Sequence, residues 1–233
     1  MAKRTQKRRP SFLITAGPTR EYFDPVRFIS NPSSGKMGIA LASASVNRAS
    51  HVTLCLGPVA SPKIRGVRIK RFESAVDLLR LVEREMKTHD ILIMTAAVCD
   101  FRPSSFLRSK IKKNAHKLRL RLVKNPDILC RLVRRFQGSK KFFAGFAAET
   151  DNVSRNAIKK LHEKNIHMIM ANRVFKEKRG FSTDASQIKV FIRGETRPFC
   201  ILKGEKKDIA KSLIPIIIDK YALFTESCLV RKR

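Results

Sequence analysis

"SFLITAG" (Ser11–Gly17) is a short apolar run that ends in glycine. A loop follows it, and residues 34–48 then carry a helical pattern, so the chain is predicted to begin as strand, loop and helix. Further patterns predict strands at 51–57, 67–72 and 91–98 and a helix at 74–88. Strands that are apolar along their whole length and alternate with helices indicate a parallel sheet covered by helices on both faces.

The pattern changes after residue 100, where a polar and basic loop precedes a half-exposed strand at 118–124. A helix restarts at 125–136, with Asn125 as its predicted N-cap and Pro126 at its first position. The later patterns predict a strand at 141–149, a helix at 153–165, a strand at 167–174, a hairpin at 180–202 and a helix at 206–224, kinked or broken at Pro215. The predicted fold is α/β: a Rossmann-like, doubly wound, mostly parallel sheet with a C-terminal antiparallel hairpin extension.

The chain has 233 residues, a length that suits one large domain or two small ones. It contains neither an internal repeat nor a long linker. We therefore predict a single domain at 11–224, between a basic N-terminal tail at 1–10 and a C-terminal tail at 225–233.

Hydrophobic residues make up 43% of the chain, but no apolar run approaches the 18 or more residues that a membrane-spanning helix needs. The first ten residues lack the apolar segment of a secretory signal, so we expect a soluble, cytoplasmic protein without a membrane partner. The five cysteines form no CxxC pair, and the five histidines never occur at metal-ligand spacing. We predict neither a disulfide framework nor a metal held by the protein itself.

The formal net charge is +31, which points to a nucleic-acid partner or to an anionic substrate. The basic residues are spread over the whole chain, and with two tyrosines and no tryptophan the chain offers few aromatic side chains for base stacking. Nucleic acid is therefore the less favoured partner. A basic nucleic-acid-binding protein on a Rossmann-like scaffold stays as the alternative function.

A parallel sheet binds ligands beyond the carboxyl ends of its strands, so the loops after "LITAG", "IMTAAV" and "AGFAAE" should face one crevice. The first loop is too long for the tight G-x-G-x-x-G turn of a dinucleotide site. It brings Asn31, Ser33, Ser34, Gly35 and Lys36 to a helix start, where backbone N–H groups favour an anion. The alternative is that Ser33 or Ser34 only caps the helix.

The two other loops carry charged side chains. Asp100 and the lysines of 110–113 follow one strand and could act in catalysis, or could serve as a cap and a solvated face. Glu149 closes another strand, and Lys160 and Lys164 share one face of the next helix, where they repel each other unless a polyanion binds there or water solvates them. No Ser-His-Asp or Cys-His set occurs in these loops, so we expect a reaction driven by positioning and by stabilising anionic charge, as in nucleotidyl transfer.

Several strings occur together and in order: "ITAGPTRE", "DPVRFISNPSSGKMGIALA", "AAVCDFRP", "KIKK", "LVKNPDIL", "GFAAET" and "KLHEKN". In this combination, over about residues 11–220, the chain closely resembles phosphopantothenoylcysteine synthetase (phosphopantothenate-cysteine ligase) of the bacterial type. In that type the domain is commonly fused behind a flavin-dependent decarboxylase. The resemblance implies a stand-alone ligase with no flavin in this chain and with the decarboxylase as a separate protein.

The resemblance also implies a two-step reaction in coenzyme A biosynthesis. The carboxylate of 4'-phosphopantothenate attacks the α-phosphate of CTP, and the amine of L-cysteine then displaces CMP from the acyl-cytidylate. Mg²⁺ is expected to arrive with the nucleotide, and a homodimer is expected in which each subunit completes the other's site.

The family's functional residues are carried over by motif. The catalytic residues implied are Asn31 and Lys110, and the substrate-binding residues are Asn31, Ala96 and Ala97. The nucleotide-binding residues implied are Ser33, Ser34, Gly35, Met94, Thr95, Ala96, Asp100, Lys110, Pro126, Asp127, Ile128, Leu129, Phe146, Lys160 and Lys164.

Overall fold

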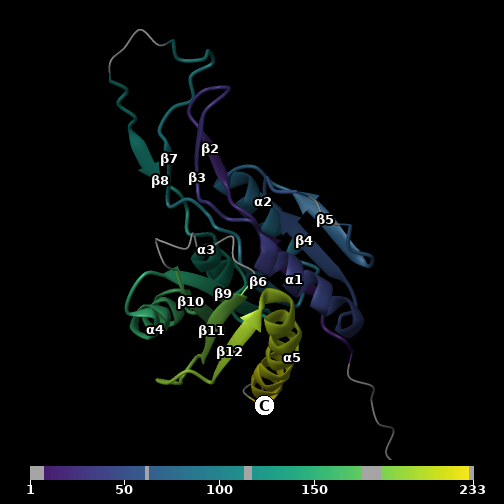
Figure 1. Ribbon diagram of the computed structural model, residues 1–233. Helices are drawn as coiled ribbons and strands as arrows, with labels where there is room; N and C mark the ends of the chain where they lie inside the picture. The colour runs from purple at the N-terminus through teal and green to yellow at the C-terminus, as the bar shows by residue number, and fades with distance from the viewer. Residues whose placement is uncertain (1–7, 61–62, 113–116, 175–184, 231–233) are drawn as a thin grey trace, which may run out of the picture.

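The computed structural model describes residues 8–60, 63–112, 117–174 and 185–230, and the predictions for residues 1–7, Lys113, 180–184 and 231–233 lie outside this part. Its centre is an eight-stranded sheet in the order β12-β11-β10-β9-β6-β1-β4-β5 (Figure 1). The strands of this sheet are β1 (Phe12–Ala16), β4 (Val52–Leu56), β5 (Val67–Arg71), β6 (Ile91–Met94), β9 (Phe142–Glu149), β10 (Met168–Arg173), β11 (Ala185–Ile192) and β12 (Cys200–Glu205).

The strand order follows the Rossmann rule. From β5 to β10 neighbouring strands are parallel, and the chain works outward from β1 first to β4 and β5 and then, on the other side, to β6, β9 and β10. The order therefore reverses between β1 and β6, which is the switch point at which open α/β sheets bind ligands. β11 and β12 add two antiparallel strands at one edge. The predicted fold class, including the antiparallel extension, is confirmed.

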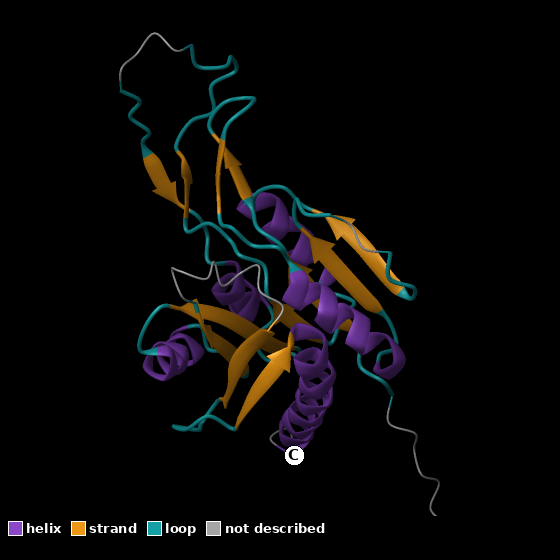
Figure 2. Cartoon of the chain, viewed as in Figure 1, coloured by secondary structure: helices purple, strands orange, loops and turns teal. Residues whose placement is uncertain are grey.

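Helices cover both faces of the sheet (Figure 2). They are α1 (Lys36–Ser45), extended by the 3₁₀ turn η1 (Val46–Arg48), α2 (Ala75–Glu85), α3 (Ile128–Arg135), α4 (Val153–Glu163) and α5 (Lys206–Val230). Side chains alternate along a strand, so Phe12 and Ile14 of β1 pack with α1 and α5, whereas Leu13 packs with α2 and α3. No helix in the described ranges is long and apolar enough to cross a bilayer.

Three predicted boundaries were wrong for identifiable reasons. α1 begins at Lys36 after Gly35 in the left-handed region (φ 71°), without a side-chain cap, so neither Ser33 nor Ser34 caps it. The N-cap of α3 is Asp127, whose side chain accepts from the Cys130 N–H group, because Asn125 is engaged elsewhere. The predicted strand at 118–124 is reduced to β8 (Leu122–Lys124).

The closing helix also differs from its prediction. α5 runs on to Val230 with Pro215 inside it, so the helix does not break there. Leu213, Ile214 and Ile217 are fully buried against the sheet, and this packing on both sides of the proline outweighs the hydrogen bond that proline cannot donate.

A second structural unit, which we call the arm, projects from the carboxyl edge of the sheet (Figure 1). It consists of two antiparallel pairs, β2 (Arg20–Tyr22) with β3 (Phe28–Ser30), and β7 (Phe101–Pro103) with β8. Asp24 ties the two halves together, because its buried carboxylate accepts from the N–H groups of Val26, Arg27 and Ile111. Burial alone would raise the pKa of Asp24, but these bonds and the Arg27 guanidinium lower it to about 2.

The first prediction concerns Gly38, on the face of α1 that meets the sheet. A Cβ atom there would lie 2.4 Å from Thr95 Oγ1 and 2.5 Å from Ala16 Cβ. Gly38→Ala should therefore lower the free energy of unfolding by about 1–3 kcal/mol through overpacking, although alanine is the better helix former. Urea denaturation measures the change.

The control is Ser43→Ala on the exposed side of the same helix, which should not reduce stability. If Gly38→Ala raised stability, helix propensity would outweigh the close contact, and the described packing of α1 on the sheet would be contradicted.

The second prediction concerns His167, whose ring packs against Phe142 and Phe224 and accepts from the Phe143 N–H group. Burial, reinforced by the charge of Arg193, lowers the pKa of His167 from 6.5 to about 4. The folded state therefore holds this ring neutral where the unfolded chain protonates it. This contribution to stability is present above pH 6.5 and is lost as the pH falls toward 4.

Denaturation at a series of pH values tests this. His167→Gln should flatten the slope of unfolding free energy between pH 4 and 6.5, whereas His162→Gln, on the exposed face of α4, should keep it. An unchanged slope in His167→Gln would contradict the assignment.

Candidate functional site

A cavity of about 460 Å³ opens at the carboxyl ends of β1, β6 and β9, at the point where the strand order reverses. Its walls come from the loops after β1 and β6, from β9, from the segment before α3, and from α4, β10, β11 and the start of α5. The loops after β1 and β6 converge as expected, but the loop after β9 does not line this cavity, because Asp151 and Asn152 line a separate hollow. The volume is that of a site for a small organic ligand.

The loops after β1 and β6 are fastened to each other. Thr15 Oγ1 accepts hydrogen bonds from the N–H groups of Thr95 (3.2 Å) and Ala96 (3.1 Å), which ends β6 and turns the chain toward the cavity. Ala97 continues the pairing with a bridge to Pro18 and donates to the Gly17 carbonyl. The backbone on both sides of the switch point is thus fixed before any ligand binds.

The start of α1 forms one wall. Gly35 takes a left-handed conformation and approaches the loop after β1 so closely that a Cβ atom there would lie 3.2 Å from the Gly17 nitrogen. No side chain caps α1, and Lys36, Met37 and Gly38 of its first turn line the cavity. Such a helix start favours an anionic ligand, so anion binding is better supported for this segment than a purely capping role of Ser33 or Ser34.

Asn31 lies between this wall and the loop after β6. Its Nδ2 group donates to the carbonyls of Ala97 (3.3 Å) and Val98 (3.1 Å). Because both of its N–H bonds are used in this way, the orientation of the amide is fixed. The amide oxygen is then the part of the side chain that can accept a hydrogen bond from a ligand.

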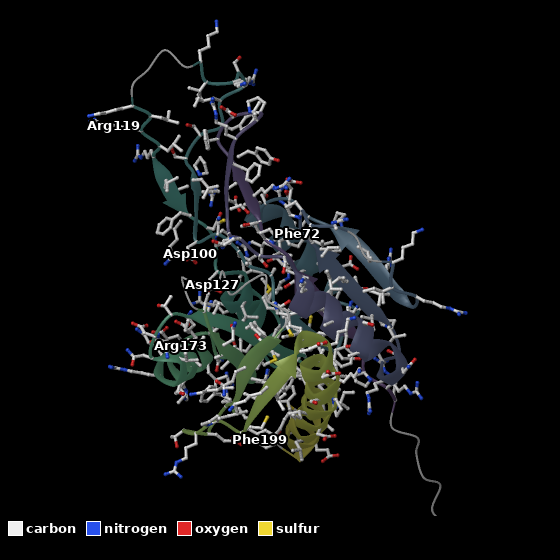
Figure 3. All side chains as sticks on the ribbon, viewed as in Figure 1. Phe72, Asp100, Arg119, Asp127, Arg173 and Phe199 are labelled. Carbon is white, nitrogen blue, oxygen red and sulfur yellow. The ribbon has the colours of Figure 1, made fainter. Side chains whose placement is uncertain are left out.

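The segment before α3 is held in place by Asn125. Its Nδ2 group donates to the Cys99 carbonyl (2.8 Å), and its backbone N–H group donates to the Asp100 carbonyl (2.8 Å). This buried clamp keeps Asp100 and Asp127 at one end of the cavity, where Figure 3 shows them together at the base of the arm.

Lys160 and Lys164, the like-charged pair on α4, are each matched by a carboxylate. Lys160 Nζ lies 2.6 Å from Glu149, and Lys164 Nζ lies 2.6 Å from Asp127. Burial raises the pKa of Asp127, but hydrogen bonds from the Cys130 N–H group and from Lys164 lower it overall. The repulsion between the two lysines is therefore relieved within the protein, and a polyanion is not needed to explain their spacing.

The sequence-predicted site residues converge with one exception. The cavity is lined by Asn31, Ser33, Ser34, Gly35, Met94, Thr95, Ala96, Ala97, Asp100, Pro126, Asp127, Ile128, Leu129, Phe146, Lys160 and Lys164. Lys110 is the exception: it is exposed on the arm and does not line this cavity. Over the described ranges, no cluster of three or more His, Cys, Asp or Glu could hold a metal.

Sequence reasoning missed one wall of the cavity, which consists of Asn172 on β10, Ser186 on β11 and Lys206 at the start of α5. Asn172 Oδ1 is buried without a hydrogen-bond partner among the described groups, so it can accept from a ligand. No local motif marks these residues, because the antiparallel strands bring them to the site from distant parts of the chain. Only the pairing of β10 with β11 and of β11 with β12 reveals them.

Comparison with known proteins identifies the family to which this chain belongs. The family model described as "DNA/pantothenate metabolism flavoprotein C-terminal domain" matches residues 8–221. The coenzyme A biosynthesis bifunctional protein CoaBC of Vibrio parahaemolyticus is 43% identical over 183 residues, which are 78% of this chain and 46% of that protein. CoaBC of Escherichia coli K12 is 38% identical over 215 residues, 91% of this chain and 52% of that protein. The chain thus spans about half the length of these relatives.

Two solved structures share the fold of this chain. A crystal structure of the C-terminal domain of CoaBC is 35% identical, with a TM-score of 0.73 over 91% of this chain and 95% of that one. A Cab2 mutant in complex with phosphopantothenate-cysteine, at 19% identity and a TM-score of 0.78 over 95% of this chain and 89% of that one, shares the fold. Together with the motifs of the sequence, these matches establish that this chain belongs to the family of DNA/pantothenate metabolism flavoprotein C-terminal domains.

Proposed function

We propose that this protein joins 4'-phosphopantothenate to L-cysteine at the expense of CTP, as a step of coenzyme A biosynthesis. The observation that carries the proposal is the chemistry of the cavity, which is lined by amides, backbone N–H groups and lysines at the switch point of the sheet. Relatives named for coenzyme A biosynthesis support the pathway, and a neighbour of the same fold binds phosphopantothenate-cysteine.

The reaction needs an activated carboxylate, because oxide is a poor leaving group. In the first step a carboxylate oxygen of phosphopantothenate bonds to the α-phosphorus of CTP, and the bond to the β-phosphate oxygen breaks to release pyrophosphate. In the second step the cysteine amine bonds to the acyl carbon and loses a proton, and CMP leaves with the electron pair of the broken C–O bond. Both steps redistribute negative charge, which helix N–H groups and lysines stabilise.

The residues of the cavity fit these steps. The segment that leads into α1, from Ser33 to Gly35, suits the triphosphate. Asn31 stands beside it with its amide fixed by the Ala97 and Val98 carbonyls. Its oxygen is therefore suited to accept an N–H bond of the incoming cysteine amine and to orient that amine toward the acyl carbon.

Mg²⁺ belongs to the proposed substrate rather than to the protein. Asp100 and Asp127 are the carboxylates among the described lining residues, and Asp127 already bonds Lys164 and the start of α3. This donor set fits a metal that arrives on the phosphates of CTP and neutralises part of their charge.

The arm supports a homodimer. Phe101, Phe106, Leu118 and Leu122 are all exposed on it, and a two-stranded sheet with an uncovered apolar surface is marginally stable alone. We propose that the arm packs against a second copy of this chain. Lys110, exposed on the arm, would then act at the partner's cavity instead of its own.

The activity is tested with purified protein, 4'-phosphopantothenate, L-cysteine, Mg²⁺ and either CTP or ATP, by following pyrophosphate and CMP or AMP. We expect product with CTP, and we expect Asn31→Ala to reduce its rate by at least about 100-fold with the melting temperature preserved, because the amine loses its orienting acceptor.

Asn47→Ala is the matched control, since this asparagine is exposed in η1 and far from the cavity lining. Absence of pyrophosphate with both nucleotides would reject the ligase function. Undiminished turnover of Asn31→Ala would reject only the role of that residue.

Complementation between subunits tests the role of Lys110. Homodimers of Asn31→Ala and of Lys110→Gln should each be nearly inactive. A heterodimer purified through two different tags should regain about half of the wild-type activity, because one of its two sites then combines an intact Asn31 with an intact Lys110. An inactive heterodimer built from correctly folded variants would show that Lys110 does not act across the interface.

A further inference from the structure

The arm joins the body of the protein through the two residues that flank its β7–β8 pair. Asp100 precedes β7 and Asn125 follows β8, and the Asn125 N–H group donates to the Asp100 carbonyl (2.8 Å). Both residues line the cavity, and Asp100 lies at the base of the arm (Figure 3). The root of the arm is therefore also a wall of the cavity.

Asn125 takes part in the same set of contacts as Asn31. Two successive carbonyls of the loop after β6, those of Ala97 and Val98, accept from Asn31. The next carbonyl, that of Cys99, accepts from Asn125 Nδ2 at 2.8 Å. Asn125 is buried, with 6% of its surface exposed. The loop that fixes the orientation of Asn31 is thus itself held by Asn125.

Arg102, the central residue of β7, holds the other end of the Asn125 amide. Its Nη1 group donates to the Asn125 Oδ1 atom and to the Lys124 carbonyl, both at 3.0 Å. The two N–H bonds of one guanidinium nitrogen therefore bridge two oxygen atoms that would otherwise repel each other. Arg102 is not among the described residues that line the cavity, so its route to the site runs through these contacts.

The segment after Asn125, from Pro126 to Leu129, lines the cavity and is held at both of its ends. Toward α4, Asp127 bonds the Lys164 ammonium group at 2.6 Å. Toward the arm, the segment is held by the contact between Arg102 and Asn125. Removing Arg102 would release the second of these two anchors.

We propose that Arg102 is a positioning residue for the nucleotide, because by fixing the Asn125 amide it holds the segment from Pro126 to Leu129 in the conformation that binds CTP. This inference rests on the proposed function, since it adds a residue to the same site. Without the guanidinium group, part of the ordering of this segment has to occur when the nucleotide binds. Ordering on binding costs affinity, so the loss falls on CTP and not on cysteine.

Isothermal titration of the full chain with CTP in Mg²⁺ tests the proposal. Arg102→Met should weaken CTP binding by about fivefold to tenfold, because it removes both charge-assisted bonds. Arg102→Lys should recover most of the affinity, since its ammonium group can donate to both oxygen atoms. Arg134→Met is the matched control: it removes the same charge from an exposed position on α3 outside the cavity lining, and it should leave the affinity unchanged.

A double-mutant cycle shows whether Arg102 acts through Asn125. Asn125→Ala should itself weaken CTP binding, and adding Arg102→Met to it should cause less than about a further twofold loss, because the contact is already absent. Losses that multiply in full would overturn the proposal. Asn125→Ser takes the place of the alanine variant should that variant fail to fold.

Steady-state kinetics separates positioning from a purely stabilising role. Arg102→Met should raise the KM for CTP and leave the KM for cysteine within about twofold of the wild-type value. If Arg102 only stabilised the arm, its loss would lower the melting temperature without this selective change in KM, and the proposal would be rejected.

The remaining outcomes separate this proposal from the proposed function. CTP binding by Arg102→Met at wild-type strength would reject the role of Arg102 and leave the ligase function standing. Sedimentation equilibrium should give Arg102→Met the same oligomeric state as the wild type. Dissociation that accompanies the lost affinity would instead assign Arg102 to the interface between copies and reject its positioning role. If the wild-type protein neither binds nor consumes CTP or ATP, the proposed function itself is rejected.

Discussion

The hydrogen bonds from the Thr95 and Ala96 N–H groups to Thr15 Oγ1 are the contact on which the site depends. They lie between the central strands β1 and β6, where the strand order reverses and the two following loops separate. Gly38 lets α1 approach this point to a distance that no side chain permits. The strand ends, the helix start and the loop after β6 thus form one rigid frame, and Asn31 is fastened to it through its amide.

This frame fits the proposed ligase reaction, for which the described part of the cavity offers positioning and anion-stabilising groups. In the proposed reaction the leaving group and the attacking groups come with the substrates, so the protein would have to position them and stabilise anionic charge. The amide of Asn31, held by the Ala97 and Val98 carbonyls, would do this with little reorganisation. The lysines on α4 are held by carboxylates, which keeps that wall in place before a ligand arrives.

Motifs that lie within one loop were predictable from the sequence. The cavity is lined by Asn31, by Ser33 to Gly35 and by the segment from Pro126 to Leu129, because each stays close to its own strand or helix end. The exact helix starts were not predictable: Asp127 caps α3 because Asn125 instead reaches Cys99 across the loop. Pro215 did not stop α5, since burial of the residues around it outweighs its local preference.

The sequence by itself determined the alternation of strands and helices, and hence the edge of the sheet at which a ligand binds, because apolar periodicity and glycine positions act over short distances. Only the tertiary structure decided which distant residues share that edge. It brought Asn172, Ser186 and Lys206 to the cavity through antiparallel pairing, and it left Lys110 exposed on the arm. The physical reason is that strand pairing and helix packing join residues far apart in the chain, and no local pattern records those contacts.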